Sequence, residues 1–298
     1  MLSILIPVYN YDVYALVSEL KHQADELGIK YEILIQDDNS HEFTSQNEKI
    51  NSLSNCHYDV NPQNIGRGKN INLLCSKANE DYVLIIESDS FPDNKNYLKN
   101  YLALISTDTP IIFGGVKYTK TVPEKDKLLR WKYGHARETK SLEKRLKNNY
   151  SFVYTWNLLL RKEILLKYPF PDFISEYGYE DAVFIKTLRL NSVPITHIEN
   201  HLIHYNNENS IDFIKKTERA VNTLYDLINM QKIEYKDIKL SAFYSIAKKL
   251  YLAGVIKIIY CKNKELILNN LTSENPNLYL LDFYKLGYLC FVSQIKNV

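Results

Sequence analysis

The chain is poor in the features that mark several protein classes. Its four cysteines, Cys56, Cys75, Cys261 and Cys290, are far apart and form no CxxC pair. Neither a zinc ribbon nor a disulfide framework is therefore indicated, and a reducing, cytosolic setting is expected. No stretch is long and apolar enough to span a bilayer, and the start MLSILIPVYN has neither a basic leader nor a cleavage site. We therefore expect a protein that is neither secreted by that route nor integral to a membrane.

Charge of one sign is also lacking. The 37 basic residues nearly balance the 35 acidic ones, and the formal net charge is +2. No field over the whole chain favours nucleic acid, so we expect no nucleic-acid partner.

A large buried core is what the chain does have material for. Its 298 residues are 45% hydrophobic, which favours one large domain or one domain with an appendage. Strand patterns at 3–9, 31–38, 56–60 and 81–89 alternate with helical patterns at 14–27 and 71–78. This alternation is typical of a parallel sheet covered by helices on both faces, with ligands bound beyond the carboxyl ends of the strands.

The second half of the chain is less regular. We expect a strand in PIIFGGVKY (110–118), a solvated helix or mobile loop at 121–150, a turn leading into a helix at 178–190, and a late strand in VPITHIENHLIHY (193–205). After about residue 210 the patterns are helical, basic and apolar. The predicted domains are therefore 1–210 and a C-terminal helical region, 211–298.

Polar groups gather at the ends of the predicted strands. Pro7, Tyr9 and Asn10 end the first strand, and Glu87 and Asp89 end the apolar run of DYVLIIESD. Strand residues two apart point the same way, so Glu87 and Asp89 present their oxygens near one point. Hard oxygen ligands suit Mg²⁺ or Mn²⁺ bridging a diphosphate. The alternative is a solvated pair of acids in a loop.

Two further motifs have both a structural and a functional interpretation. Asp37 and Asp38 could cap the next element, or one of them could accept a hydrogen bond from a nucleobase imide or a ribose hydroxyl. NIGRGKNIN lacks the third glycine of a dinucleotide fingerprint and the Ser or Thr of a P-loop. It could simply open the next helix, although Arg67 and Lys69 would suit a pyrophosphate there.

Five segments together resemble the family 2 glycosyltransferases of the GT-A fold. They are SILIPVYN, ILIQDDNS, NIGRGKNINLL, DYVLIIESDSFP and EYGYEDAVFIKTLRL, in family order and rough spacing over residues 1–210. The resemblance implies an α/β fold with a mixed, mainly parallel central sheet and, here, a C-terminal helical appendage. It also implies a nucleotide-diphospho-sugar donor, a divalent metal (Mn²⁺ or Mg²⁺) held by a DxD motif, and inversion at the anomeric carbon.

The same resemblance gives roles to individual residues. Asp181 matches the catalytic base, with Glu180 beside it binding a hydroxyl of donor or acceptor, and Glu87 and Asp89 match the DxD motif. The expected donor-binding set is Pro7, Tyr9, Asn10, Asp37, Asp38, Arg67, Lys69 and Ser88. Two departures are Glu87 in place of Asp and Ile71 in place of an arginine of many relatives.

A histidine and several aromatic residues complete the predicted site. Of His197, His201 and His204, we choose His204 as a metal ligand, because a histidine at the end of this late strand matches the ligand position in relatives. Trp156 and Tyr179 could stack on a sugar ring, and Asn157 lies where relatives contact the substrate. Trp156 could equally be core.

The expected function is that of a cytoplasmic, metal-dependent, inverting glycosyltransferase. It would move a sugar from a UDP-sugar to a glycan or lipid-linked acceptor in surface polysaccharide synthesis. The apolar, lysine-containing C-terminal helices could lie on the inner face of a membrane, pack on their own domain, or form a homo-oligomer.

Two rival functions remain. A sugar-nucleotide nucleotidyltransferase would need GxGxR after the first strand, where this chain has PVYNYD. A degenerate relative that binds a nucleotide or glycan, or serves as a scaffold, is favoured by Glu87 and Ile71. The intact pair Glu180 and Asp181 counts against it.

Overall fold

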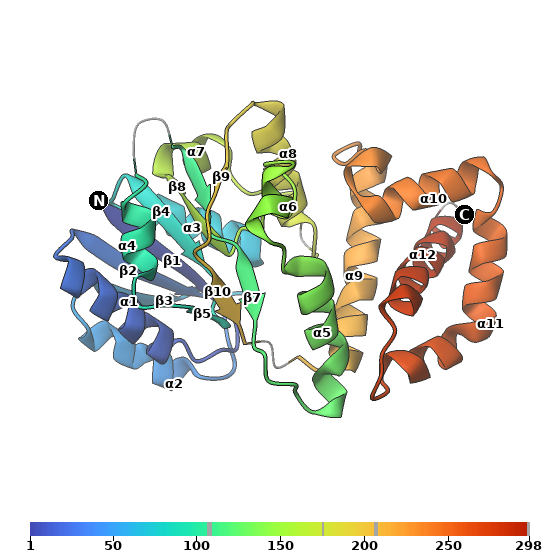
Figure 1. Cartoon of the computed structure of the whole chain (residues 1–298), viewed down its shortest axis with the longest axis horizontal. Coiled ribbons are helices and arrows are strands. Elements are labelled where there is room, and N and C mark those ends of the chain that lie inside the picture. Colours follow the sequence, from blue (N-terminus) through green and yellow to red (C-terminus); the bar gives the residue numbers. More distant parts are fainter. Residues whose placement is uncertain (106–108, 175, 206–207, 297–298) are drawn as a thin grey trace. The chain divides into compact units, whose positions relative to one another are not determined.

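The computed structural model describes residues 1–105, 109–174, 176–205 and 208–296. They form two compact units. The first, here the sheet unit, comprises 1–119, 137–175 and 180–205; the second, the helical unit, comprises 120–136, 176–179 and 206–298 (Figure 1). The helical unit thus includes two earlier segments besides the C-terminal helices, and the domain boundary at residue 210 stays a prediction.

A seven-stranded sheet forms the centre of the sheet unit, in the order β3-β2-β1-β4-β8-β6-β9. Its strands are β1 (Leu2–Val8), β2 (Tyr31–Asp37), β3 (Cys56–Val60), β4 (Tyr82–Ile86), β6 (Ile111–Phe113), β8 (Asn157–Arg161) and β9 (Thr196–His197). Only β8 runs antiparallel to its neighbours, β4 and β6. The predicted mixed, mainly parallel sheet is confirmed.

Helices cover this sheet on both faces. The connection from β1 through α1 (Tyr14–Leu27) to β2 runs toward the β3 edge of the sheet. The connection from β3 through α3 (Arg67–Lys77) to β4 runs in the opposite direction, toward β9. Because such crossovers are right-handed, α1 and α3 lie on opposite faces. Both faces of β1 and β2 are accordingly buried along their whole length. Shorter helices of this unit are α2 (Thr44–Asn47), α4 (Tyr97–Leu102), α7 (Lys162–Lys167) and α8 (Glu180–Leu190).

Two segments that each predict one strand form two strands instead. PIIFGGVKY gives β6 and then β7 (Val116–Tyr118), and the late strand gives β9 and then β10 (Leu202–His204). The second strand of each pair joins a small sheet in the order β5-β10-β7, with β5 being Ser90–Pro92. Gly114 and Gly115 allow the break: Gly115 has φ +83°, and a Cβ on Gly114 would lie 2.2 Å from the carbonyl oxygen of Asn200.

The charged segment 121–150 is more ordered and more buried than expected. It contains 3₁₀ residues Lys125–Lys127, α5 (Leu128–Tyr133), a π-helical turn (Gly134–Glu138) and α6 (Leu142–Leu146). Leu129 is fully buried in the helical unit, and Arg145 is buried in the sheet unit, where its guanidinium donates to the carbonyl of Ile198 at 2.9 Å. The charge pattern is consistent with the expected solvated helix over most of the segment, but it did not predict the burial of these individual side chains.

The helical unit contains α9 (Ser210–Asn229), α10 (Lys239–Lys249), α11 (Ala253–Leu271) and α12 (Leu278–Ile295), together with α5. Its core includes Leu129, Tyr260, Leu271, Leu281 and Tyr284. Across the described ranges of the chain, no helix has the length and apolar character needed to cross a membrane.

Candidate active site

Three parallel strands end at one edge of the large sheet, as the sequence predicted. Val8 of β1 lies opposite Asp37 of β2, and Leu5 of β1 lies opposite Ile85 of β4. The residues that follow these strands therefore emerge at the same edge, where ligands bind in open α/β sheets. The candidate site is built on this edge.

Arg67 joins two of the predicted acids. It is the first residue of α3, and its Nε and Nη2 lie 2.9 and 2.8 Å from Glu87 Oε2. Its Nη1 donates to Asp181 Oδ1 at 2.9 Å and to Thr155 Oγ1 at 3.1 Å. Burial alone would lower the pKa of Arg67, but the charges of Glu87 and Asp181 outweigh that effect and raise it. One guanidinium thus links the end of β4 to the start of α8.

Asp181 is the predicted base, and the structure holds it in a defined orientation. It lies in the first turn of α8, where backbone amides favour an ionised carboxylate. Thr155 Oγ1 donates to Asp181 Oδ1 at 2.6 Å, and the same oxygen accepts from Arg67. Thr155 is fully buried. Both partners hold the Asp181 carboxylate in one orientation.

The neighbouring Glu180 has a different environment. Its Oε2 is buried and has no hydrogen-bond partner among the described residues. Burial raises the pKa of Glu180 and the charge of Asp181 raises it further, against the opposing effect of Arg67. Glu180 is therefore harder to ionise than a carboxyl group in water.

Asp89 and His204 form the second half of the site. His204 Nε2 lies 3.3 Å from Asp89 Oδ1. The pairing of β5 with β10 sets this distance, because His204 lies opposite Ser90 in the register. The rings of Tyr118 and Trp156 lie 5.3 and 5.1 Å from the His204 ring and fix its position.

The other two histidines of this segment lie elsewhere. His197 Nε2 is 2.8 Å from the carbonyl oxygen of Asn149, and His201 Nε2 is 2.9 Å from Glu199 Oε2. Among the three, His204 is therefore the one beside an acid of the DxD-like motif.

A divalent metal could take two protein donors here. Within the part of the chain that the structure describes, no three His, Cys, Asp or Glu side chains come together as ligands. Glu87 is paired with Arg67 instead of with Asp89 and His204. Mg²⁺ and Mn²⁺ sites commonly combine one or two side chains with substrate phosphates and water. Asp89 and His204 fit that type of site, and Glu87 is not arranged as their third partner.

Asp37 and Asp38 are both buried and already hydrogen-bonded. Asp37 accepts from the amide of Ser40 at 2.7 Å and from the hydroxyl of Tyr58 at 2.6 Å. Asp38 accepts from the amides of Ile65 and Gly66, each at 2.8 Å. Asp38 therefore fixes the loop that begins α3, and Gly66 supplies the φ of +84° that this loop requires just before Arg67.

The remaining donor-side residues surround the strand ends. Pro7 lies within buried β1, whereas Tyr9 just beyond it is half exposed. Asn10 has φ +51° and accepts from the amide of His41 at 2.8 Å. Ser88 lies between the two acids after β4, and Lys69, in the first turn of α3, forms no ion pair with any described residue. Their contacts with a nucleotide stay predictions.

The acceptor residues proposed from the sequence separate into three cases. Asn157 is fully buried, accepts from the hydroxyls of Tyr97 and Tyr101, each at 2.7 Å, and donates to Gly115 and Asn200 carbonyls at 2.6 and 2.9 Å. The side-chain amide thus makes four hydrogen bonds inside the core. The expected contact between Asn157 and the substrate stays a prediction.

Trp156 and Tyr179 differ from Asn157. Trp156 is also buried, 9% exposed, and belongs to the large core cluster. Tyr179 is partly exposed at φ +66°, immediately before Glu180. Stacking of either ring on a sugar stays a prediction.

Two residues near the site were not predicted. Thr155 donates a hydrogen bond to Asp181 and accepts one from Arg67. The second residue is Tyr11. Burial raises the pKa of Tyr11, and the charge of Asp89 raises it further. The adjacency of Thr155 to Trp156 and Asn157 was the one available signal for the first. For Tyr11, the signal was its place after the first strand, beside Tyr9 and Asn10.

Comparisons with known proteins concern the family and the fold of this chain. A sequence model described as glycosyl transferase family 2 matches residues 3–168. A comparison with curated proteins gives no match. Among solved structures, the mannosyltransferase PcManGT from Pyrobaculum calidifontis, in complex with GDP-Man and Mn²⁺, is similar with a TM-score of 0.57 and 12% identity, covering 99% of this chain and 86% of that one.

Two further solved structures match this chain. Mannosyl-3-phosphoglycerate synthase from Rubrobacter xylanophilus has a TM-score of 0.55 and 16% identity, covering 78% of this chain and 76% of that one. TarS from S. aureus has a TM-score of 0.46 and 20% identity over 76% of this chain, and this chain spans 40% of the length of that protein. The family match covers more than half of the chain, and the fold is similar to those of PcManGT and mannosyl-3-phosphoglycerate synthase: the chain belongs to glycosyl transferase family 2 and has the GT-A fold.

Proposed function

We propose that the protein transfers a sugar from a nucleotide-diphospho-sugar to a hydroxyl of an acceptor, with inversion and with Asp181 as the base. The observation that carries this proposal is the bridge made by Arg67. The Arg67 side chain pairs both with Asp181, at the start of α8, and with Glu87, which follows β4. A base and the strand end expected to bind the donor thus share one cluster.

The reaction assigns a specific task to Asp181. Its carboxylate takes the proton of the acceptor hydroxyl as that oxygen bonds to the anomeric carbon from the face opposite the leaving group. The bond from that carbon to the diphosphate breaks, and its electron pair leaves with the diphosphate. Thr155 and Arg67 hold the carboxylate of Asp181 in a fixed orientation before the proton moves.

Charge on the leaving group needs compensation. Asp89 and His204 would hold a divalent metal, which when bound would supply electrostatic stabilisation of the diphosphate. Lys69, at the N-terminal turn of α3, provides a further positive charge in a place suited to phosphate. Arg67 supports the same end of α3 but is engaged with two carboxylates, so its contact with phosphate would require it to release at least one of them.

The donor is expected to be a UDP-sugar, bound by residues around the three strand ends. Tyr9 and Asn10 are exposed enough to contact a nucleoside, and the backbone that Asp37 and Asp38 position would line the pocket with Pro7 and Ser88. PcManGT was solved with GDP-Man, so GDP-sugars belong in the same test. The acceptor is expected to be a glycan or a lipid-linked glycan of surface polysaccharide synthesis.

One observation favours a second candidate, a relative that binds a nucleotide or glycan without turnover. Arg67 neutralises both Glu87 and Asp181, which a purely structural ion cluster would also do. Incubating the protein with UDP- and GDP-sugars, Mn²⁺ and mixed saccharide acceptors, and measuring the released nucleoside diphosphate, tests the choice. Release that disappears in Asp181→Asn supports the transferase; nucleotide binding with an equal background rate in both proteins supports the binding function.

A further inference from the structure

Helices α10 and α11 of the helical unit expose an unusual number of large hydrophobic side chains. Eight of them, each at least 45% exposed, lie within residues 243–259: Phe243, Ile246, Leu250, Tyr251, Leu252, Val255, Ile258 and Ile259. We name these eight residues the apolar corner, because they follow α10, the turn after it, and the first half of α11. Large exposed apolar patches on proteins commonly mark interaction sites.

The apolar corner is a second hydrophobic face, separate from the core. Phe243, Ile246 and Leu250 recur at helical spacing on one side of α10, while Tyr244 and Ala247 are buried on the other. On α11, Val255 and Ile259 are exposed, whereas Tyr260 and Ile267 are in the core. The core of the helical unit is thus formed by the buried faces of α10 and α11. The apolar corner lies on their exposed faces and is available to a partner.

Backbone geometry holds the corner in shape. Tyr251 has φ +59°, and the amide of Leu252 donates to the carbonyl of Ala247 at 2.8 Å. This hydrogen-bonded turn ends α10 and aims the side chain of Tyr251, 91% exposed, into solvent. The patch is therefore preformed.

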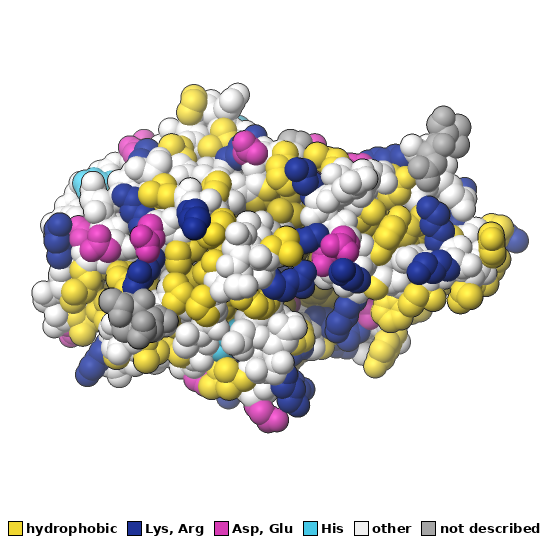
Figure 2. Space-filling view, turned by 90° about the horizontal axis from the view of Figure 1, so that it is seen from above, with side chains coloured by type: hydrophobic (Ala, Val, Ile, Leu, Met, Phe, Trp, Pro, Cys, Tyr) yellow, Lys and Arg dark blue, Asp and Glu magenta, His cyan; other side chains and the backbone are white. Residues whose placement is uncertain are grey.

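The charged residues within this stretch of the sequence have a single sign. Residues 239–264 contain no acidic residue and six lysines: Lys239, Lys248, Lys249, Lys257, Lys262 and Lys264. Lys264 pairs with Glu218, and the other five form no ion pair with any residue that the structure describes. The nearest acids on either side of this stretch in the sequence are Asp237 and Glu265. Figure 2 shows Lys and Arg side chains among hydrophobic ones at the surface of the helical unit.

We propose that the apolar corner inserts its side chains into the interfacial region of an anionic lipid membrane, with the surrounding lysines on the headgroups. Apolar side chains flanked by lysine are the pattern of helices that lie in a membrane surface. A second copy of this chain is disfavoured as the occupant, because a symmetric contact would set one group of unpaired lysines against another. No described helix is suited to cross the bilayer, so the contact is peripheral.

The proposal does not depend on the sugar-transfer activity, and its test measures only lipid binding. The full chain is sedimented with vesicles of phosphatidylcholine and with vesicles that also contain phosphatidylglycerol. We expect binding to the anionic vesicles that is at least about tenfold stronger than to neutral ones and weakens as salt is raised.

Two variant groups separate the apolar and basic contributions. Phe243→Ser with Ile258→Ser should lower binding to anionic vesicles by about tenfold or more, because insertion of apolar groups is lost. Lys248→Gln with Lys249→Gln should lower binding and make it less sensitive to salt. The control is Leu190→Ser, which changes a side chain of α8 that is 70% exposed and far from this stretch in the sequence, and should bind as wild type does.

Two outcomes would overturn the proposal. One is absence of binding to anionic vesicles at low salt. The other is a dimer in sedimentation velocity that Phe243→Ser with Ile258→Ser dissociates, which would make a second copy the occupant. Nucleotide binding, measured on the same variants, should be unchanged, so a failure here is distinct from a failure of the proposed function.

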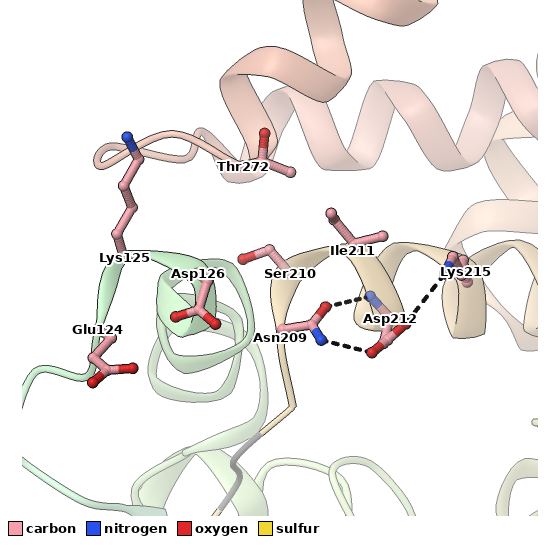
Figure 3. A pocket seen from close by; sticks show the side chains of 9 residues that line it. All are labelled: Glu124, Lys125, Asp126, Asn209, Ser210, Ile211, Asp212, Lys215 and Thr272. Carbon is pink, nitrogen blue, oxygen red and sulfur yellow. Dashed lines mark hydrogen bonds and ion pairs between the residues drawn. The ribbon is translucent and has the colours of Figure 1, made fainter.

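A pocket at the start of α9 is a weaker candidate. It is lined by Glu124, Lys125, Asp126, Asn209, Ser210, Ile211, Asp212, Lys215 and Thr272 (Figure 3). Asn209 accepts from the amide of Asp212 and donates to its carboxylate, and Lys215 pairs with that carboxylate as well. Its mixed charges indicate no single class of ligand.

Discussion

The Arg67 guanidinium lies 2.9 Å from Asp181 Oδ1, across 114 residues of sequence. The same side chain holds Glu87, so the start of α3, the end of β4 and the start of α8 meet at one cation. Arg67 thus holds together Asp181, the proposed base, and Glu87, an acid that follows β4.

Arg67→Ala should lower kcat/KM for sugar transfer by about 100-fold, because displacement of a catalytic group by an ångström can cost that much. Arg67→Lys should recover little, since an ammonium cannot bridge two carboxylates in the fork geometry of a guanidinium. Steady-state kinetics on both variants test this. Arg161→Ala, at a partly exposed ion pair with Glu163, is the matched control and should change little. Full activity in Arg67→Lys would contradict a bridging role.

Asp181→Asn should lower kcat by about 10²- to 10⁴-fold, because a general base contributes on that scale, and should leave nucleotide affinity nearly unchanged. The amide oxygen can still accept from Thr155, so the fold should persist. Circular dichroism and nucleotide titration on the variant verify this. A wild-type rate of transfer in Asp181→Asn would exclude Asp181 as the base.

His204→Gln should lower the affinity for Mn²⁺ in the presence of nucleotide by at least about tenfold. Loss of a metal ligand or of its supporting partner lowers metal affinity by about 10- to 100-fold or more. The matched control is His201→Gln, because His201 pairs with Glu199 and does not contact Asp89. Titration of Mn²⁺ at fixed nucleotide gives both values. Equal effects of the two substitutions would remove His204 from the metal site.

Glu180→Gln should stabilise the protein at neutral pH by about 1 kcal/mol, because it removes a buried carboxylate oxygen with no hydrogen-bond partner. The pKa of Glu180 is raised in the folded state, so the folded protein binds this proton more tightly than the unfolded chain. Below its ordinary pKa, Glu180 is protonated in both states and does not lower the free energy of unfolding. As pH rises above that value, its ionisation lowers the free energy of unfolding increasingly.

The stability difference between Glu180→Gln and wild type should accordingly vanish near pH 4 and increase toward neutral pH. Thermal unfolding at several pH values measures this difference. Glu143→Gln, at an exposed site, is the control and should show no such trend. A constant difference at every pH would show that the ionisation of Glu180 is not its source.

Asn157→Ala should destabilise the protein by about 3 kcal/mol, since it leaves buried hydroxyls and carbonyls without partners. Urea unfolding measures the loss. If Asn157 instead contacted the acceptor, the substitution would raise the KM for the acceptor with little change in stability. That pattern would overturn its assignment to the core.

The sequence predicted the main elements of the sheet unit because periodicity and strand-end chemistry are local. Helix Tyr14–Leu27 and strand Cys56–Val60 have the predicted bounds. The breaks after Phe113 and His197 were missed, because they depend on Asn157 holding distant carbonyls rather than on local pattern. The glycines at 114 and 115 were the one local sign of the first break.

The site was predicted in part for the same reason. Spacing in DYVLIIESD places Glu87 and Asp89 correctly at a strand end, but it cannot reveal that Arg67 pairs with Glu87 or that His204 lies beside Asp89. Both pairs depend on contacts between different elements, and Asp89 and His204 lie more than 100 residues apart in the sequence. Ion pairs and buried amides of this kind follow from tertiary packing, which no single segment encodes.

The most direct test of the account is calorimetric titration of UDP and GDP, with dTDP as a control, into wild type and Asp89→Asn, with Mn²⁺ and again with a chelator. The account predicts that one nucleotide binds wild type with Mn²⁺, that the chelator removes most of this affinity, and that Asp89→Asn resembles the chelated protein. If no nucleotide binds under any condition, or if binding is the same with and without metal, the proposed donor site at the ends of β1, β2 and β4 is contradicted.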